Sequence, residues 1–561
     1  MKVVKFFIRC SKSISYSKRI IAFVIVAGII GGVSNTAVLA LINKALNSDA
    51  AGAQRFVWLF AGLCLVAATS KALSQVLLIR FATGTVFNLR MQLCRQILKS
   101  PLRHLEEIGP HRLLATFTED IPVITAALTH LPNLCINLVI VAGCLLYMLW
   151  LSWTLFLLVL GSVALGALTY HLMEKRSTRA FNLARERMMH LLKHFRSLVD
   201  GRKELKLHRQ RRNEFLTQDI EATAASVARH RVSAATAYSI AENWGEILIF
   251  LVIGLLLFAF SSLRDANPLT LTGYIITVLY MTTPLQFVLN VFPTIGQAEA
   301  SINKVEEIRT ALAVHANESE ATPLSDTASA WSSLELRGVT HSYYREKESS
   351  SFTLGPIELS LTPGELLFIT GGNGSGKTTL VKLLTGLYTP EEGALYLDGK
   401  PVTSENRDHF RQHFSVVFSD FFLFDKLLGL PNLDAQAREY LELLQLENKV
   451  EVKNGVLSTI DLSQGQRKRL ALLTAYLEDR PVYIFDEWAA DQDPLFRDVF
   501  YHQLLPDLKE RGKTVVVVSH DDRYYHIADR VIKLDYGRLE SDQLTPRGHE
   551  FVAAGSPVAA N

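Results

Sequence analysis

The segment Gly371–Thr379, GGNGSGKTT, has the spacing of a phosphate-binding loop, G-x-x-x-x-G-K-[ST]. Glycines at this spacing let backbone N–H groups approach phosphate oxygens, and a helix that begins at the loop adds its positive end. We expect Lys377 to reach the β- and γ-phosphates and the Thr378 hydroxyl to bind Mg²⁺. The flanking stretches Phe368–Thr370 and Leu380–Gly386 predict a buried strand before the loop and a helix after it. The candidate nucleotide-binding residues here are Gly371, Gly372, Asn373, Gly374, Ser375, Gly376, Lys377, Thr378 and Thr379.

A second apolar stretch, Val482–Glu487, ends in two acidic residues. It follows the loop by about a hundred residues, the order found in P-loop domains. Asp486 is predicted to hold Mg²⁺, mainly through water, and Glu487 to polarise the attacking water. A strand that ends in Asp-Glu is common, so this pair supports nucleotide hydrolysis only together with the loop.

The segment Leu462–Gln466, LSQGQ, lies just before that strand. It resembles the LSGGQ signature of the ABC ATPases, with Gln464 in place of the first glycine. In that family the signature of one subunit caps the γ-phosphate bound by the other subunit. The resemblance implies that Ser463 and Gly465 contact ATP in trans. The whole candidate segment is Ser463, Gln464, Gly465 and Gln466.

Other residues match further ABC motifs, in the same order along the chain. Tyr343 matches the aromatic residue that stacks on adenine, and Asp493 matches the D-loop that crosses the dimer interface. His520, after the apolar stretch Val515–Ser519, matches the switch histidine that contacts the γ-phosphate. A single histidine after a strand is usually structural, so the catalytic role of His520 beside Glu487 is implied by the resemblance.

The Q-loop departs from the family pattern. Most ABC exporters place a glutamine there that reaches Mg²⁺ and the attacking water, and this chain has Ser419 followed by Asp420. The alignment makes Ser419 a candidate metal residue, together with Thr378 and Asp486. One interpretation is that Ser419 shapes the loop while the metal keeps an extra water, which Mg²⁺ tolerates. The other is that Asp420 or a bridging water replaces the amide, and substrate completes the site by moving the loop.

The composition indicates a membrane protein with no nucleic-acid partner. Hydrophobic residues make up 49% of the 561 residues, and the mean hydropathy of +0.18 is high for a soluble protein. The net charge of +3 is too small to indicate nucleic-acid binding. The five cysteines include no CxxC pair, so neither a disulfide framework nor a zinc site is predicted.

Roughly six apolar segments reach the length of about 20 residues that a membrane-spanning helix needs. They are Ile20–Ile42, Phe56–Leu78, Leu131–Leu151, Trp153–Leu172, Trp244–Leu263 and Thr272–Ile295. The first is too long for a signal peptide and lacks a clear cleavage site. The expected fold is therefore an all-α six-span transmembrane domain, followed by an α/β P-loop ATPase domain.

Basic residues predict the orientation, because cytoplasmic segments carry an excess of Lys and Arg. Three segments are basic and are expected in the cytoplasm: Lys2–Arg19, Arg80–Arg112 and Lys175–Arg231. The short connections near Asn47–Ala53, Ser152 and Ser261–Pro268 carry little charge and are expected outside. Both termini are then cytoplasmic. The long cytoplasmic segments are expected to extend the helices, with reversals near Glu106–Pro110 and Asp200–Gly201.

Ionisable residues inside predicted spans mark possible substrate contacts, because charge in a bilayer is costly. Glu242 and Glu246 are four residues apart and share a helical face, and Lys71 lies in the second span. Either these residues line a polar translocation cavity, or the glutamates lie in water at the cytoplasmic end while Lys71 extends to the membrane surface.

We expect four parts along the chain. They are a transmembrane domain at 1–308, a linker at 309–330, an ABC nucleotide-binding domain at 331–545 and a C-terminal tail at 546–561. Residues 309–330 are rich in Ala, Ser, Thr and Glu without an apolar period, as in a surface connection. From Trp331 onward, short alternating runs are typical of an α/β domain.

The whole chain resembles an ABC exporter half-transporter. Gly201–Leu205, Phe418–Phe424 and Glu487–Pro494 resemble the bacterial cyclic-peptide and siderophore exporters, the group of the syringomycin and pyoverdine transporters. This resemblance implies ATP-driven export of a peptide-like product across the bacterial inner membrane, with Mg²⁺, by two identical copies embedded in lipid. It also implies coupling helices near Leu102–Leu113 and Val199–Leu207. A multidrug or lipid exporter of the same fold is the alternative. A soluble ABC ATPase would lack the spans, and an importer usually has the two domains on separate chains.

Overall fold

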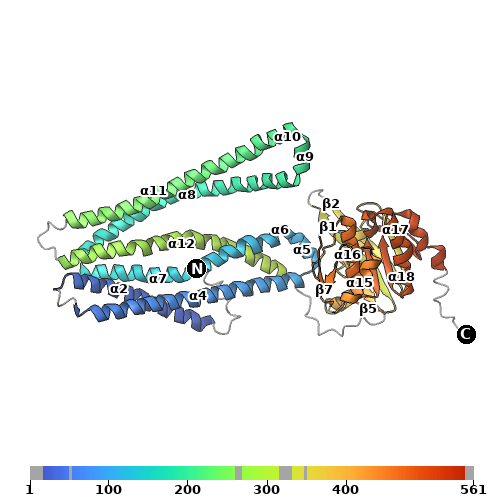
Figure 1. Ribbon diagram of the computed structural model, residues 1–561, viewed down its shortest axis with the longest axis horizontal. Coiled ribbons are helices and arrows are strands. Elements are labelled where there is room, and N and C mark those ends of the chain that lie inside the picture. The colour runs from blue at the N-terminus through green and yellow to red at the C-terminus, as the bar shows by residue number, and fades with distance from the viewer. Residues whose placement is uncertain are drawn as a thin grey trace. The chain divides into compact units, whose positions relative to one another are not determined.

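A computed structural model describes residues 17–49, 54–259, 268–314, 331–345, 350–430 and 432–549 (Figure 1). The chain divides into two compact units. One comprises Met1–Gln92 and Leu114–Glu306, and the other comprises Leu93–Leu113 and Glu307–Asn561. Most of the predicted linker, from 315 to 330, and most of the predicted tail, from 550 onward, lie outside the described residues.

Long helices follow from the long apolar segments of the first half. Their bounds are α2 Ser17–Leu46, α4 Val57–Lys99, α7 Ile121–Leu151, α8 Trp153–Asp200, α11 Ala222–Gly254 and α12 Pro268–Val314. Short helical segments extend or connect them: α5 Leu102–Ile108, α6 Pro110–Ala115, η1 Thr116–Asp120, α9 Arg202–Leu207, α10 Arg209–Glu214, η2 Phe215–Glu221 and η3 Leu255–Ala259. Figure 1 shows α8 and α11 side by side and joined at their ends by α9 and α10, where the sequence predicts a reversal.

Within the described residues, five helical stretches are long and apolar enough to cross a membrane. They are Val26–Leu46, Val57–Lys99, Pro110–Leu151, Arg209–Phe258 and Leu269–Leu312. The predicted fourth span falls in α8, where a shorter apolar helical stretch covers Trp153–Gly166. The end of the predicted fifth span, from 260 to 263, lies outside the described residues.

Buried polar contacts join the helices near the connections that are expected outside. Asn43 on α2 is 2% exposed, and its amide donates to the Tyr147 hydroxyl of α7 at 3.1 Å and to the Leu269 carbonyl of α12 at 3.0 Å. The Tyr274 hydroxyl of α12 donates to the Met148 carbonyl at 2.5 Å. Such bonds satisfy polar groups that would otherwise face apolar surroundings, and so they fix how the helices pack.

The second unit is built on sheets. The strands are β1 Leu334–Arg345, β2 Ser350–Leu361, β3 Leu366–Gly371, β4 Glu392–Leu397, β5 Lys400–Pro401, β6 Phe414–Val417, β7 Val452–Lys453, β8 Val456–Leu457, β9 Val482–Asp486, β10 Thr514–Val518, β11 Arg530–Asp535 and β12 Arg538–Leu544. The helices are α13 Lys377–Leu384, α14 Arg407–Arg411, α15 Asp434–Leu443, α16 Gln464–Glu478, η4 Trp488–Asp491, α17 Pro494–Val499, η5 Phe500–Leu504, α18 Leu505–Glu510 and η6 Asp522–Ile527.

One sheet has the strand order β12-β11-β3-β10-β9-β6, and another has the order β2-β1-β4-β5. In the first sheet β3, β10 and β9 run parallel, with Val518 opposite Ile369 on one side and opposite Asp486 on the other. Strands β9 and β10 are buried throughout, which explains their continuous apolar sequences. Parallel strands end at one edge, so the loops after β3, β9 and β10 meet there.

Candidate nucleotide-hydrolysis site

The phosphate-binding loop connects β3 to α13, as the sequence predicts. Gly374 and Gly376 have φ angles of 79° and 102°, in the left-handed region that glycine adopts at low cost. A Cβ atom at Gly376 would also lie 2.9 Å from the Leu354 side chain. The loop therefore requires glycine for its backbone shape, and α13 presents its N-terminus at the end of the loop.

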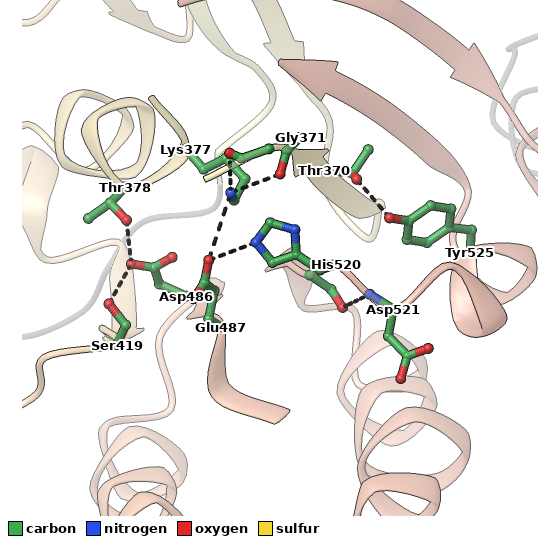
Figure 2. Close-up of polar contacts among 12 residues, drawn as sticks. Thr370, Gly371, Lys377, Thr378, Ser419, Asp486, Glu487, His520, Asp521 and Tyr525 are labelled. Carbon is green, nitrogen blue, oxygen red and sulfur yellow. Dashed lines mark hydrogen bonds and ion pairs between the residues drawn. The ribbon is translucent and has the colours of Figure 1, made fainter. Parts of the chain in front are cut away.

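Lys377 is the first residue of α13, and its ammonium lies under the loop. Its Nζ donates to the carbonyl oxygens of Gly371 and Gly372, at 3.0 Å each. Burial lowers the pKa of Lys377, an effect that Glu487 and Asp486 partly oppose. The ammonium lies 3.8 Å from the Glu487 carboxylate, so it joins the loop to the end of β9 (Figure 2).

The three residues predicted to bind metal meet at one carboxylate. Asp486 Oδ2 accepts hydrogen bonds from the Thr378 hydroxyl at 3.1 Å and the Ser419 hydroxyl at 3.3 Å (Figure 2). Burial raises the pKa of Asp486, while its hydrogen bonds with Thr378 and Ser419 act in the opposite direction. Its Oδ1 is buried and has no hydrogen-bond partner among the described residues.

This oxygen cluster fits a hard divalent cation. Two hydroxyls and an unpaired carboxylate oxygen are donors that Mg²⁺ accepts, with waters and substrate phosphates completing its octahedral shell. The described residues contain no group of three or more His, Cys, Asp or Glu side chains suited to a metal. Any cation here would therefore depend on hydroxyl, phosphate and water oxygens.

Glu487 and His520 face each other at the ends of β9 and β10. Their side chains lie 3.0 Å apart, from His520 Nε2 to Glu487 Oε1 (Figure 2). Glu487 has a φ of 50°, a left-handed backbone that costs a non-glycine residue about 1–3 kcal/mol. Such strained positions persist only where neighbouring contacts hold them, and they are common at active sites.

Those neighbouring contacts come from residues that the sequence patterns did not single out. Lys468 on α16 is 2% exposed and donates from Nζ to the Glu487 carbonyl at 2.9 Å. The Trp488 indole donates to the Lys468 carbonyl at 2.9 Å, and its ring stacks on Phe500. The apolar character of Trp488 signals burial, but nothing in the sequence pairs it with Lys468.

The signature segment forms the start of α16. Ser463 is the N-cap, and its hydroxyl accepts from the Gln466 N–H while the Gln466 side chain accepts from the Ser463 N–H. A Cβ atom at Gly465 would lie 2.8 Å from the Asp491 carbonyl, so glycine permits close packing against η4. No hydrogen bond joins Ser463 or Gln464 to the phosphate-binding loop in the described part of this chain, and their contact with ATP in trans stays a prediction.

Asp493 caps the helix after the D-loop. Its carboxylate accepts from the Phe496 N–H at 3.0 Å and pairs with Arg469 of α16. The hydrogen bond from the Phe496 N–H lowers the pKa of Asp493, and the positive charge of Arg469 lowers it further, although burial opposes these effects. The D-loop and the signature helix are therefore held together within one chain.

Helix α5, in the first predicted coupling segment, belongs to the same unit as the ATPase domain. Glu106 accepts from Lys382 of α13 at 2.8 Å and also from the Tyr388 hydroxyl. Arg103 forms an ion pair with Glu391 at 2.8 Å. The segment therefore contacts α13, the helix that carries Lys377, which is predicted to bind phosphate.

The remaining predicted residues lie apart from this cluster. Tyr343 is on β1, with its backbone opposite Phe352, and its side chain is outside the described atoms. The Glu242 side chain on α11 is likewise outside them, and Glu246 on the same helix is exposed. Lys71 on α4 is exposed and lines a cavity in the helical unit.

Comparison with known proteins identifies the class. Residues 354–490 match the family described as ABC transporter, and residues 19–287 match the family described as ABC transporter transmembrane region. The ATP-binding protein SyrD of Pseudomonas syringae pv. syringae is 37% identical over 93% of this chain and 94% of its own length. The chain belongs to the ABC transporter family and is an ABC exporter, an integral membrane protein that couples ATP hydrolysis to transport.

Other relatives agree with this class. The ATP-dependent lipid A-core flippase of Alkalilimnicola ehrlichii is 28% identical over 81% of this chain and 78% of its own length. A bacterial Atm1-family ABC exporter solved with ATP bound has a TM-score of 0.68 at 15% identity, covering 97% of this chain and 99% of that one. The predicted exporter fold, with a helical membrane domain followed by an ABC ATPase domain, is confirmed.

Proposed function

We propose that this exporter moves a cyclic or modified peptide, or a siderophore-type product, across the bacterial inner membrane. The observation that carries the proposal is the 37% identity with SyrD across nearly the whole chain. That identity exceeds the 24–28% found with several lipid A-core flippases. The resemblance to the syringomycin and pyoverdine transporter group, at Gly201–Leu205 and the D-loop, supports the same substrate class.

In the proposed reaction, Glu487 polarises the water that attacks the γ-phosphate, and His520 binds that phosphate. Lys377 and the loop N–H groups bind the phosphate oxygens, and Tyr343 stacks on adenine. Thr378, Asp486 and Ser419 would hold Mg²⁺, which neutralises phosphate charge as the bond to the leaving group breaks. The 3.0 Å distance between His520 Nε2 and Glu487 Oε1 supports these roles, because it places both side chains beside the Lys377 ammonium, which lies 3.8 Å from Glu487.

We further propose that two identical chains form the working unit, with both termini in the cytoplasm. Each chain carries both a phosphate-binding loop and a signature segment, so two copies could build two composite sites. Mixing a Lys377→Ala chain with a Ser463→Arg chain gives a heterodimer with one doubly damaged site and one intact site. ATPase activity should return in the mixture, whereas a mixture as inactive as either parent would argue against composite sites.

The substrate class is tested with protein reconstituted in lipid discs. Cyclic peptides should stimulate the ATPase and accumulate in inverted vesicles that contain the protein, and the Glu487→Gln variant serves as the transport-dead control. The second candidate is lipid export, favoured by the relatives named as lipid A-core flippases. Stimulation by lipid A-core with no response to peptides would favour that candidate and contradict peptide export.

A further inference from the structure

The helical unit contains a cavity of about 620 Å³ lined by four helices, α2, α4, α7 and α12. Its volume lies within the range of small-molecule sites, about 300–1,000 Å³. Aliphatic side chains form much of the wall, and polar side chains from each of the four helices interrupt it. These polar residues are Asn35, Lys71, Asn137, Tyr280 and Thr283.

The polar residues lie at similar depths along their helices. At a rise of 1.5 Å per residue, Lys71 lies about 21 Å from Val57, where α4 begins. By the same calculation Asn137 lies about 21 Å from the end of α7, and Asn35 about 17 Å from the end of α2. In a hydrocarbon core about 30 Å thick that begins at these helix ends, Lys71, Asn137 and Asn35 lie inside the membrane.

Lys71 brings a positive charge into the wall of this cavity. No carboxylate lies within ion-pair distance of Lys71 in the described part of the chain. Intramembrane charges are costly and usually pair with another group or mark a ligand path. An anionic group on a bound molecule would supply the missing counter-charge.

The two asparagines are oriented by their own helices. The Asn35 amide donates to the Gly31 carbonyl at 3.0 Å, and the Asn137 amide donates to the Asn133 carbonyl at 2.7 Å. Each amide keeps a second N–H and a carbonyl oxygen, and neither oxygen accepts a hydrogen bond from the described residues. Each amide therefore offers a hydrogen-bond donor and an acceptor next to each other, which match the C=O and N–H of a peptide group.

A proline adds a further acceptor. Pro284 lies inside α12 and lines the same cavity. Proline has no N–H, so the Tyr280 carbonyl one turn earlier lacks its usual intrahelical donor. In membrane helices such freed carbonyls are satisfied by neighbours, water or a ligand.

We infer that this cavity binds a peptide-like molecule carrying a carboxylate, with Lys71 pairing the carboxylate and Asn35 and Asn137 bonding to peptide groups. The inference rests on the proposed export of peptide-like products and narrows that class to anionic members. Aliphatic walls suit the side chains of such a molecule, and the Tyr280 carbonyl suits one of its N–H groups. An anionic lipid could also pair with Lys71, but it would leave the amide groups unmatched.

The first test measures the charge of the cavity without any substrate. Cys64 lines the cavity seven residues before Lys71, and both lie on one face of α4, about 10 Å apart. In a variant whose other four cysteines are replaced by serine, Cys64 is labelled with an anionic and a cationic methanethiosulfonate. We expect the ratio of the labelling rate with the anionic reagent to that with the cationic reagent to fall about fivefold or more in Lys71→Gln. The ratio should stay near the wild-type value in Lys71→Arg. Arg80→Gln, which removes a cation outside the cavity on the same helix, should not change the ratio.

The second test uses two cyclic heptapeptides that differ by a single glutamate or glutamine. In discs of phosphatidylcholine, the glutamate peptide should half-saturate ATPase stimulation at about a tenfold lower concentration than the glutamine peptide. A charge-assisted hydrogen bond is roughly of that strength. Lys71→Gln should remove the difference, whereas Lys71→Arg and Arg80→Gln should keep it.

The possible results distinguish the inferred carboxylate preference from the proposed export of peptides. Equal potency of the two peptides leaves peptide export standing and overturns the carboxylate preference. A labelling ratio unchanged by Lys71→Gln overturns the preference whatever the peptides do. If phosphatidylglycerol stimulates in a Lys71-dependent way and neither peptide does, the cavity binds lipid and both proposals fail.

Discussion

The ammonium of Lys468 lies 2.9 Å from the carbonyl oxygen of Glu487 and 2.8 Å from the Asp491 carboxylate. Lys468 belongs to α16, whose N-cap is the signature residue Ser463, whereas Glu487 is the proposed catalytic carboxylate. A single buried cation therefore connects the helix that follows the signature segment, expected to cap the partner's ATP, with the backbone of the residue that carries the proposed catalytic carboxylate. Movement of the signature helix would displace Glu487 through this contact.

Replacing Lys468 by methionine tests that connection. Met has a similar length but leaves the Glu487 carbonyl and the Asp491 carboxylate without their donor. Losing such a charged hydrogen bond costs about 1.5–3 kcal/mol, so kcat should fall about 10- to 100-fold. The KM for ATP should change little, because Lys468 contacts Glu487 and Asp491 and makes no hydrogen bond with the phosphate-binding loop in the described part of the chain.

Steady-state ATPase kinetics of the Lys468→Met protein in lipid discs measure both constants. Lys449→Met, an exposed lysine of the same domain, is the control and should behave as wild type. Thermal unfolding checks that both variants fold. A kcat within twofold of wild type in folded Lys468→Met would show that Glu487 is positioned without this lysine.

Glu487→Gln tests the catalytic carboxylate directly. Glutamine keeps the shape and the contact with His520 but cannot accept a proton from water. Turnover should fall about 10²- to 10⁴-fold, the usual contribution of a general base. Nucleotide binding and closure of the dimer should survive. ATP binding and ATPase rates of the purified variant are compared, and near-normal hydrolysis would remove Glu487 from this role.

Glu106 and Glu107 form a matched pair for testing the α5 contacts. Glu106 bonds to Lys382 and Tyr388, whereas Glu107 bonds only to Arg103 and His104 of its own helix among the described residues. Glu106→Ala should keep basal ATPase within about twofold but reduce stimulation by substrate, because the link to α13 is broken. Glu107→Ala should leave stimulation unchanged. The measurement is the ratio of ATPase rates with and without substrate in lipid discs. Equal ratios in the two variants would contradict a role of the α5 contacts in coupling.

The sequence predicted the parts of the site that depend on short spacing. The glycine loop, the two acids after β9 and the histidine after β10 are local patterns, and parallel-strand topology explains why they meet. Lys468 was missed because nothing in its surroundings distinguishes it from a solvated helix lysine. Glu106 and Lys382 are 276 residues apart, so only the folded chain pairs them. The side chains of Lys71, Asn35 and Asn137 share a cavity through packing of separate helices, which spacing cannot predict.

The environment of Glu478 predicts how the stability of the ATPase domain depends on pH. Burial raises the pKa of Glu478 on α16, while the Ser415 hydroxyl, 2.8 Å away, and Arg480 partly oppose the shift. A carboxyl with a raised folded-state pKa contributes stability that is present below its unfolded pKa and lost as pH rises through its folded pKa. The ionised form is therefore the unfavourable one at neutral pH.

Glu478→Gln keeps an acceptor for Ser415 and removes that charge. We expect the melting temperature of the ATPase-domain transition to rise about 2–4 °C at neutral pH. The difference from wild type should shrink at about pH 4.5, close to the pKa of an ordinary glutamate, because wild-type Glu478 with its raised pKa takes up its proton above that pH. Scanning calorimetry at the two pH values measures this, and a pH-independent difference would mean that packing rather than charge is responsible.

Substitutions of Ser419, the residue at the Q-loop position, distinguish between the two interpretations of how the site is assembled. Ser419 donates to Asp486 at 3.3 Å, so its hydroxyl already lies beside the predicted metal ligands, while Asp420 is exposed. A serine side chain is two heavy atoms shorter than the glutamine found in most ABC exporters. It can reach Asp486 but cannot also reach the attacking water without a bridge. If substrate completes the site by moving this loop, basal ATPase is low and stimulation is strong.

Ser419→Gln should then raise basal turnover several-fold and reduce the stimulation ratio, because the longer amide spans the gap without substrate. Ser419→Ala removes the hydroxyl without adding reach, so it should lower basal turnover and keep strong stimulation. ATPase rates of the three proteins are compared in the same lipid, with and without a stimulating cyclic peptide. If Ser419→Gln changes neither the basal rate nor the ratio, Ser419 only shapes the loop, and a retained water completes the metal shell, as Mg²⁺ readily accepts.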